Sequence, residues 1–347
     1  MAELDSPRAL SGLSEGTGSQ PSSTPDSEQG AIDVSVLVVA YNSAALIEAC
    51  IASVPSACTL RSFEILLIDN GDGSTEALVR DHFPAVRIVP SRGNIGFAAG
   101  NNALASHANG RYLLLLNPDM KLFPGSIDAL FEGVAAYPQA SAWGGVTVDA
   151  QNRPDTGNAI PMPSLAEFAQ AALGSSSAAS LPPERLEQDG QVDLLMGGFV
   201  MFTRTAWDAA KGLDERYFLY CEEVDLFYRL ARMGHTFWRI SAARGHHEAG
   251  HGEGSSPMRL LYHAAGTAEY ARTHWSRPAA ALGRALFWLA ATERYLGGRL
   301  LGRWIPRLQS REKAYRLVAR YPGLWWYGYN KQRGLLVQLN QRGGAPP

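Results

Sequence analysis

The sequence has few cysteines and no long apolar segment, and each absence excludes a class of protein. Its 347 residues include three cysteines, Cys50, Cys58 and Cys221, which are too few and too scattered for a disulfide framework or a cysteine zinc site. No uninterrupted apolar run of about 18 residues occurs, so we expect no transmembrane helix. The N-terminus lacks a basic segment followed by an apolar one and does not resemble a secretory signal. These absences favour a reducing, cytoplasmic setting.

Acidic residues are scarce in the C-terminal part of the chain. Between Arg272 and Arg342 there are fourteen Lys and Arg against two acids, Glu293 and Glu312, although the net charge of the whole chain is -2. Arginine interleaved with aromatic residues is typical of nucleic-acid binding or of attachment to an anionic membrane surface. Five of the eight tryptophans lie in or beside this stretch: Trp275, Trp288, Trp304, Trp325 and Trp326.

The N-terminal half alternates strand and helix patterns. Residues 1 to about 31 are rich in Ser, Gly, Pro and acids and predict a flexible tail. Apolar runs at 34–40, 63–69 and 111–117 predict strands buried on both faces. This alternation predicts an α/β fold with a mostly parallel sheet flanked by helices. Helix-compatible segments follow the three runs at 43–54, 74–82 and about 124–136.

The second half has less regular patterns. Residues 149–193 predict an irregular insertion of about 40 residues over the site. An apolar run at 193–205 is interrupted by Gly197 and Gly198, which indicates close approach of a ligand or of another backbone segment. The remaining expected elements are a helix at 222–233, a strand at 236–241, a polar loop at 244–256 and helices at about 258–275 and 279–298.

Polar residues follow the predicted strands at the positions where a parallel sheet binds its ligands. The segments are AYN at 40–42, DNGDGS at 69–74 and NPD at 117–119. Neither the GxGxxG nor the GxxxxGK[ST] fingerprint follows the first strand, which argues against dehydrogenases and P-loop proteins. A nucleotidyltransferase normally has a basic glycine-rich loop at this position, and its absence here argues against that class as well.

Two groups of carboxylates are candidates for chemistry. Asp119 is a hard oxygen ligand suited to Mg²⁺ or Mn²⁺, or else it caps the turn made with Pro118. Glu222, Glu223 and Asp225 lie at the start of a predicted helix among aromatic residues. The helix dipole favours anions there for purely structural reasons, whereas an apolar setting with like-charged neighbours would raise a carboxylate pKa toward that of a general base.

Two loops are candidates for phosphate or metal contacts. His246, His247 and His251 lie among glycines, where they either reach a metal or a phosphate or are simply exposed. Residues 91–104, SRGNIGFAAGNNAL, put a loop before a helix whose free N–H groups could face a diphosphate. The alternative is an ordinary turn capped by Asn94.

Taken together, the segments resemble family 2 glycosyltransferases with the GT-A type fold, especially the bacterial rhamnosyltransferase-like branch. The resemblance covers about Val34 to Trp275 and follows the family order. Its segments are VSVLVVAYNS, LLIDNGDGS, RGNIGFAAGNN, LLLLNPD, MGGFVMFTR, GLDERYFLYCEEVDLFYRLARMG and HHEAGHGEGSS.

The resemblance implies a set of site residues. Asp69 would read the nucleobase, and Asp119 would bind Mg²⁺ or Mn²⁺. His247 would contact the metal or the diphosphate, with His246 a close second, and Glu223 beside Glu222 would be the catalytic base. The family usually has Glu-Asp where this chain has Glu222-Glu223, and the DNGDGS loop is two residues shorter than usual. Further nucleotide-sugar contacts would come from Ala40, Tyr41, Asn42, Arg92, Asn94, Gly96, Asn101 and Asn117, and the acceptor side from Gly197, Gly198 and Asp214.

The implied reaction is inversion by single displacement. A sugar would move from a nucleotide-sugar, dTDP-rhamnose or a UDP-sugar, to a hydroxyl of a glycan or lipid-linked acceptor in cell-surface polysaccharide synthesis. The Glu222-Glu223 pair and the short loop leave a non-catalytic nucleotide-sugar-binding or scaffold protein as the alternative.

The expected domains are the tail at 1–31, a catalytic domain at 32–275 and a basic, Trp-rich helical extension at 276–347. Residues 282–304 have apolar residues at helical spacing with arginines between them, which favours peripheral attachment at the inner face of the cell membrane. Helices that pack on the domain or on a second subunit are the alternative. A nucleic-acid partner is not expected, although salt-sensitive binding of DNA or RNA would reveal one.

Overall fold

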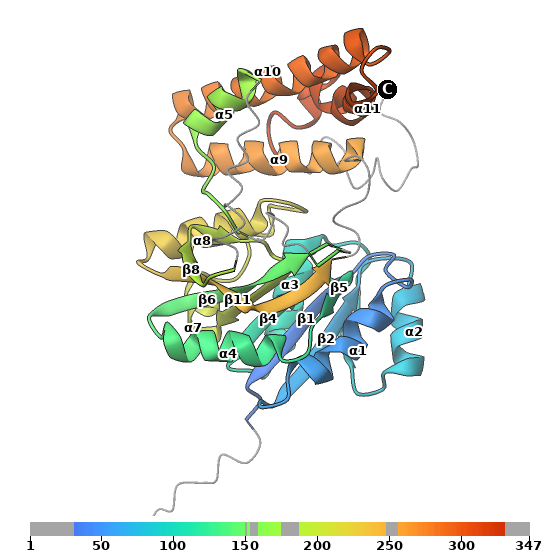
Figure 1. The fold of residues 1–347 in the computed structure, drawn as a ribbon, viewed down its shortest axis with the longest axis vertical. Helices are drawn as coiled ribbons and strands as arrows, with labels where there is room; N and C mark the ends of the chain where they lie inside the picture. The colour runs from blue at the N-terminus through green and yellow to red at the C-terminus, as the bar shows by residue number, and fades with distance from the viewer. Residues whose placement is uncertain (1–30, 150, 153–158, 175–186, 248–255, 330–347) are drawn as a thin grey trace, which may run out of the picture. The chain divides into compact units, whose positions relative to one another are not determined.

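The computed structural model describes residues 31–149, 151–152, 159–174, 187–247 and 256–329, and the predicted N-terminal tail lies outside these ranges. Its centre is a nine-stranded sheet with the order β3-β2-β1-β4-β10-β6-β11-β5, and β8 pairs with β11 (Figure 1). The strands are β1 (Val34–Ala40), β2 (Phe63–Asp69), β3 (Arg87–Ile88), β4 (Tyr112–Leu116), β5 (Met120–Leu122), β6 (Ala140–Val148), β8 (Gly190–Val192), β10 (Phe199–Thr203) and β11 (Thr236–His247).

The sheet is mostly parallel. β3, β2, β1 and β4 pair in parallel, as do β6 and β11, whereas β10 is antiparallel to both of its neighbours. The register pairs Ala40 with Asp69, so the strands β1 and β2 end side by side. The predicted α/β class with a mostly parallel sheet is confirmed.

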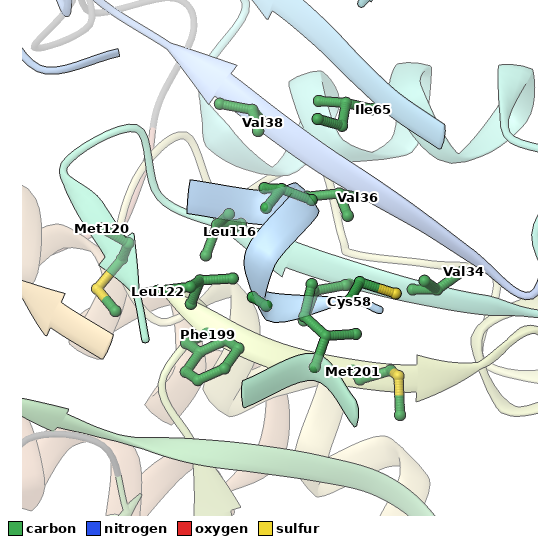
Figure 2. Packing of buried hydrophobic residues seen from close by; sticks show 14 of the residues in the cluster. Val34, Val36, Val38, Cys58, Ile65, Leu116, Met120, Leu122, Phe199 and Met201 are labelled. Carbon is green, nitrogen blue, oxygen red and sulfur yellow. The ribbon is translucent and has the colours of Figure 1, made fainter. Parts of the chain in front are cut away.

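Side chains of β1 alternate between two apolar cores. Val34, Val36 and Val38 pack on the side covered by α1 (Ile47–Ala57) and α4 (Ser126–Ala136), as Figure 2 shows for the three valines. Leu37 and Val39 belong to the opposite core, which includes side chains from α3 (Phe97–His107), α7 (Arg204–Ala209) and α8 (Glu222–Arg232). Both faces are covered, which is why β1 is apolar throughout rather than alternating with polar residues.

Three helices at the C-terminal end share a third core. α9 (Pro257–His274), α10 (Arg277–Leu301) and α11 (Pro306–Arg320) pack together through a cluster that includes Leu261, Ala291, Val318 and Trp325. The 3-10 helix η2 (Pro322–Leu324) precedes Trp325. The domain boundary expected between residues 275 and 276 therefore falls within a group of helices that share one core.

Two regions differ from the sequence-based expectation. The supposedly irregular stretch 149–193 contains β7 (Ala159–Ile160), which pairs with β9 (Leu194–Leu195), and α5 (Leu165–Ala172). A capping box between Ser164 and Glu167 starts α5, and Phe168 packs edge-on against Phe287 of α10. The helix was missed because its apolar side chains pack on a helix distant in the sequence. The second correction concerns 244–247, which extend β11 instead of beginning a polar loop.

The other helices and strands that were predicted from the sequence are present with shifts at their ends, whereas β6 and α11 were not predicted. α2 spans Ser74–His82 as expected, and α1 begins at Ile47, four residues after the predicted start. Gly197 and Gly198 lie in the link between β9 and β10, so the predicted single run over 193–205 is two short strands.

Candidate active site

A cavity of about 620 Å³ opens at the ends of the central strands. Its walls come from the segments after β1 and β4, the β9–β10 link, the turn before α8, the end of β11 and the first turns of α9. A cavity of this size is in the range of small-molecule sites. Of the predicted site residues, it is lined by Tyr41, Asn42, Asn94, Gly96, Asn117, Asp119, Gly197, Gly198, Glu222, Glu223 and His247.

Asp69 supports the wall of the cavity from behind. Its carboxylate is 2% exposed and accepts hydrogen bonds from the backbone N–H groups of Gly71 at 2.7 Å and Glu76 at 3.0 Å. A Cβ on Gly71 would lie 2.8 Å from the Asn42 nitrogen, so the short loop packs directly on the segment after β1. Asp69 does not itself line the described cavity wall, and the neighbouring Asn70 does. The prediction of nucleobase contact by Asp69 stays a prediction.

The loop before α3 joins the cavity to the turn before α8. Gly96 is the residue that precedes α3, with φ +89°, and its N–H donates to the Asn94 side-chain oxygen at 3.2 Å. Gly96, and not Asn94, is therefore the N-cap of α3, and the alternative of an ordinary turn capped by Asn94 is wrong. A Cβ on Gly96 would lie 2.6 Å from the Phe218 carbonyl oxygen, which explains why glycine is required there.

Four predicted site residues other than Asp69 lie outside the cavity wall. Arg92 is exposed, and Ala40 is fully buried at the end of β1. Asn101 is buried in α3 and donates to the Phe97 carbonyl oxygen at 3.0 Å. Asp214 forms an ion pair with Arg216 at 2.5 Å. Their placement adds no support to direct substrate contact.

Asp119 and His247 approach one another from different strands. Asp119 lies in the turn between β4 and β5, and the antiparallel register of β11 with β5 sets His247 opposite Met120. The His247 Nε2 atom lies 3.3 Å from Asp119 Oδ2. Asp119 Oδ1 is buried and has no hydrogen-bond partner within the described part of the chain.

The two histidines at the end of β11 are not equivalent. Successive strand residues point to opposite sides of the sheet, and of the pair only His247 is part of the described cavity wall. His251 lies outside the described residues. The choice of His247 over His246 agrees with this placement.

The donor set suits a divalent cation that also binds substrate oxygens. A carboxylate with an unpartnered oxygen and an imidazole are ligands that Mn²⁺ accepts, and Mg²⁺ commonly takes one or two carboxylates together with substrate phosphates. Across the described ranges no cluster of three or more His, Cys, Asp or Glu could hold a metal alone. The residues present therefore fit a cation whose remaining ligands come from substrate and water.

Glu222 and Glu223 start α8 behind a strained turn. Tyr220 and Cys221 both have φ +69°, a left-handed conformation that is unfavourable for residues other than glycine. The two glutamates are 3% and 6% exposed, and Oε2 of each has no partner among the atoms the structure describes. Both line the cavity.

The two carboxyl groups are buried on adjacent residues, and each changes the pKa of the other. Burial and the adjacent Glu223 carboxylate raise the pKa of Glu222 well above its usual range. Burial also raises the pKa of Glu223, but hydrogen bonds from its own backbone and from Glu222 oppose that rise. Of the two, Glu222 is therefore the carboxyl group that favours its protonated form more strongly.

Asp225, the third carboxylate of this segment, has a structural role. It is fully buried and pairs with Arg229 at 2.7 Å and with His274 of α9 at 2.6 Å. It does not contribute to the described cavity wall. Asp225 thus has the structural role that was one of the two expectations for this segment, but through ion pairs rather than the helix dipole, whereas the two glutamates face the cavity.

The paired glycines allow the β9–β10 link to approach its neighbours. A Cβ on Gly198 would lie 3.0 Å from the side-chain nitrogen of Asn117, and one on Gly197 would lie 3.4 Å from Phe97. The Asn117 N–H donates to the Gly198 carbonyl oxygen at 3.0 Å. The sequence-based inference of close approach at these glycines is confirmed, although their contact with an acceptor remains a prediction.

The contribution of α9 to the cavity wall was not predicted from the sequence. Arg259 and Tyr262, one helical turn apart, line the cavity together with Phe218 and Tyr220. Arg259 and Tyr262 are three positions apart, a spacing that places them on the same face of a helix. Nothing in the local sequence of α9, however, shows that this helix packs beside the turn before α8.

Comparisons with known proteins decide the family. The family described as Glycosyl transferase family 2 matches residues 35–207. A protein of Mycobacterium tuberculosis (strain H37Rv) named N-acetylglucosaminyl-diphospho-decaprenol L-rhamnosyltransferase is 32% identical over 250 residues, which cover 65% of this chain and 79% of that protein. The chain belongs to glycosyl transferase family 2. Its activity is therefore that of a glycosyltransferase, as the sequence resemblance implied.

Further likenesses in sequence and in structure agree with this assignment. The rhamnosyltransferase WbbL of Escherichia coli K12 is 24% identical over 196 residues, which cover 54% of this chain and 74% of that one. The mannosyltransferase PcManGT of Pyrobaculum calidifontis, solved in complex with GDP-Man and Mn²⁺, superposes with a TM-score of 0.54 at 17% identity, covering 85% of this chain and 87% of that one. The rhamnosyltransferase-like branch and the GT-A type fold, both expected from the sequence, are confirmed.

Proposed function

We propose that this family 2 protein is an inverting, metal-dependent rhamnosyltransferase whose acceptor is a lipid-linked sugar diphosphate. The observation that carries the proposal is the meeting of Glu223 with Asp119 and His247 in one cavity, although the three come from α8, the β4–β5 turn and β11. A buried carboxylate and a cation-binding pair in one cavity are the groups that displacement at an anomeric carbon needs.

Asp119 and His247 would hold Mg²⁺ or Mn²⁺ at the donor side. The bound cation supplies positive charge near the diphosphate as it departs. Asn117 and the loop at Asn94 and Gly96 line the same cavity and would contact the nucleotide-sugar. Asp69 would act through the loop it supports, since its hydrogen bonds to Gly71 and Glu76 fix the segment packed against Asn42.

Glu223 would remove the proton from the acceptor hydroxyl as that oxygen attacks the anomeric carbon. The bond to the nucleoside diphosphate breaks as the new glycosidic bond forms, and configuration inverts. Burial favours this role because a raised carboxylate pKa makes a better base. Glu222, holding a proton, would keep the Glu223 carboxylate oriented by donating a hydrogen bond to it.

A lipid-linked acceptor fits both the relatives and the surface of α10. The M. tuberculosis relative is named for an acceptor linked to diphospho-decaprenol. On α10, Leu282, Leu289, Leu296 and Leu300 are exposed. Among the described helices, none has the length and apolarity required to cross a membrane. We therefore propose that α10 lies on the membrane surface, where arginines of the same region attract anionic lipid.

To test the enzymatic proposal, the protein is incubated with dTDP-rhamnose, a polyprenyl-diphosphate N-acetylglucosamine acceptor and Mn²⁺. Mass spectrometry of the lipid detects the added deoxyhexose, and enzyme-coupled detection follows dTDP release. We expect acceptor-dependent release. Binding of dTDP-rhamnose without any transfer or hydrolysis, with this and related acceptors, would instead favour a non-catalytic nucleotide-sugar-binding protein.

A further inference from the structure

A single strong cation lines the described wall of the cavity, and the roles proposed so far do not use it. Arg259 in the first turn of α9 is the one Lys or Arg among the lining residues that the structure describes. Its Nε atom donates to the Tyr220 hydroxyl at 3.0 Å. Within the described ranges its guanidinium makes no ion pair with Glu222, Glu223 or Asp119, the carboxylates of the same cavity.

The position of Arg259 is unfavourable for a purely structural arginine. The partial positive charge at a helix N-terminus repels a cation, and the first turn of α9 has no acidic residue to offset this. The side chain is also exposed, so burial of its stem does not account for it. An anionic ligand in the cavity would turn this arrangement into a favourable one.

The chemistry of the side chain indicates which anion. A guanidinium binds phosphate oxygens with paired N–H groups. The bond to Tyr220 occupies Nε and leaves both Nη groups as donors. Tyr220 itself is fixed by the left-handed turn that delivers Glu222 and Glu223, so the arginine is tied to the catalytic turn. Asp119 and His247 meet elsewhere on the cavity wall, at the end of β11.

We propose that Arg259, oriented by Tyr220, binds the diphosphate group of a ligand in this cavity. The proposal rests on the transferase function proposed above, in which both reactants carry a diphosphate: the nucleotide-sugar donor and the lipid-linked acceptor. Arg259 would recognise the same diphosphate oxygens in the donor and in the acceptor.

The first test measures binding of inorganic pyrophosphate in EDTA by titration calorimetry, which requires neither metal nor turnover. Arg259→Gln should weaken pyrophosphate binding about tenfold, because it loses charge-assisted hydrogen bonds. Arg259→Lys should recover part of the loss. Arg277→Gln is the matched control, since Arg277 is an exposed arginine in the first turn of α10 that is not part of the described cavity wall. Equal pyrophosphate affinity of Arg259→Gln and wild type, with equal thermal unfolding, would overturn the proposal.

The second test identifies the source of the diphosphate through steady-state kinetics with both substrates. A KM raised about tenfold for the lipid acceptor, with the donor KM unchanged, assigns Arg259 to the acceptor diphosphate. The reverse pattern assigns it to the donor. No change in either KM would overturn the proposal. If wild type transfers no sugar, the proposed function fails while the pyrophosphate comparison still decides the role of Arg259.

Discussion

Gly266 of α9 lies against the backbone of Tyr220. A Cβ at position 266 would be closer to the Tyr220 carbonyl oxygen than real Cβ contacts allow. The same turn is approached from the C-terminal side, where the Tyr329 hydroxyl donates to the Leu219 carbonyl oxygen. α9 and the segment after η2 therefore both pack against the turn that precedes Glu222 and Glu223.

Gly266→Ala should separate α9 from this turn. Alanine usually improves a helix by about 1 kcal/mol over glycine, but overpacking costs about 1–3 kcal/mol. We expect a net loss of stability and a lower kcat, measured by denaturant unfolding and by transfer. Gly297→Ala in α10 is the control, because nothing lies within 4 Å of a Cβ there. It should gain stability and keep full activity. A fully active Gly266→Ala would contradict a role of this packing in catalysis.

Asp225 should be essential for stability and not for chemistry. Asp225→Ala removes the shared partner of Arg229 and His274 and leaves these two partly buried donors without it, which should cost about 1–3 kcal/mol. Glu76→Ala, which breaks an exposed ion pair with Arg80, should cost less than about 1 kcal/mol. Chemical denaturation compares the two. Similar losses would mean that the Asp225 pairs contribute no more than a surface ion pair.

Glu222 should make the stability of the protein depend on pH. Its pKa in the folded state is raised by burial and by Glu223, so its protonated form is favoured there more than in the unfolded chain. The associated stability is complete below the usual carboxyl pKa and is lost as pH rises through the raised value. Glu222→Gln should therefore flatten the fall in unfolding free energy above about pH 4.3. An unchanged slope would show that the proton is not held at Glu222.

Metal binding should depend on Asp119 and on His247 but not on His246. Mn²⁺ with dTDP should raise the melting temperature of wild type, since a ligand of the folded state stabilises it. Asp119→Asn and His247→Ala should lose most of the Mn²⁺-dependent part of this shift. His246→Ala is the control, because His246 lies on the same strand and does not line the described cavity. If Asp119→Asn kept the full Mn²⁺-dependent rise in melting temperature, Asp119 would be excluded as a metal ligand.

The apolar face of α10 should bind anionic vesicles. Replacing both Leu289 and Leu296 with Ser should lower the bound fraction in flotation assays by at least about tenfold, since each buried leucine contributes about 1.5–3 kcal/mol. Leu60→Ser is a matched control, because Leu60 is 75% exposed but lies between α1 and β2. Point variants are preferable to removal of 277–347, which would also remove Tyr329 from the catalytic turn. Equal flotation of the double variant and wild type would end the membrane proposal.

The sequence predicted those features that depend on local pattern. Buried parallel strands are apolar throughout, and their ends carry the polar residues, so the sheet and the approach of Asn42, Asn117 and Asp119 to one cavity followed from the order of the segments. Similarly, the close approach at Gly198 followed from two glycines within an apolar run.

Features that depend on distant packing could not be predicted in this way. His247 points into the cavity because β11 extends to pair with β5, and the Gly-rich sequence around it suggested a loop. Asp225 pairs with His274 on α9, about fifty residues away, as well as with Arg229, whereas Glu222 faces the cavity. Arg259 is a candidate because α9 packs beside Tyr220, and this contact between distant segments cannot be predicted from the local sequence pattern.

The most direct test of the account compares wild type, Glu222→Gln and Glu223→Gln in transfer of rhamnose from dTDP-rhamnose to the lipid-linked acceptor, with dTDP-rhamnose binding measured in parallel. Loss of a general base should lower kcat by about 10²–10⁴ in Glu223→Gln while donor binding is retained. Glu222→Gln should stay within about tenfold of wild type, because the neutral amide also donates a hydrogen bond to Glu223. Full transfer by Glu223→Gln with intact donor binding would contradict the account.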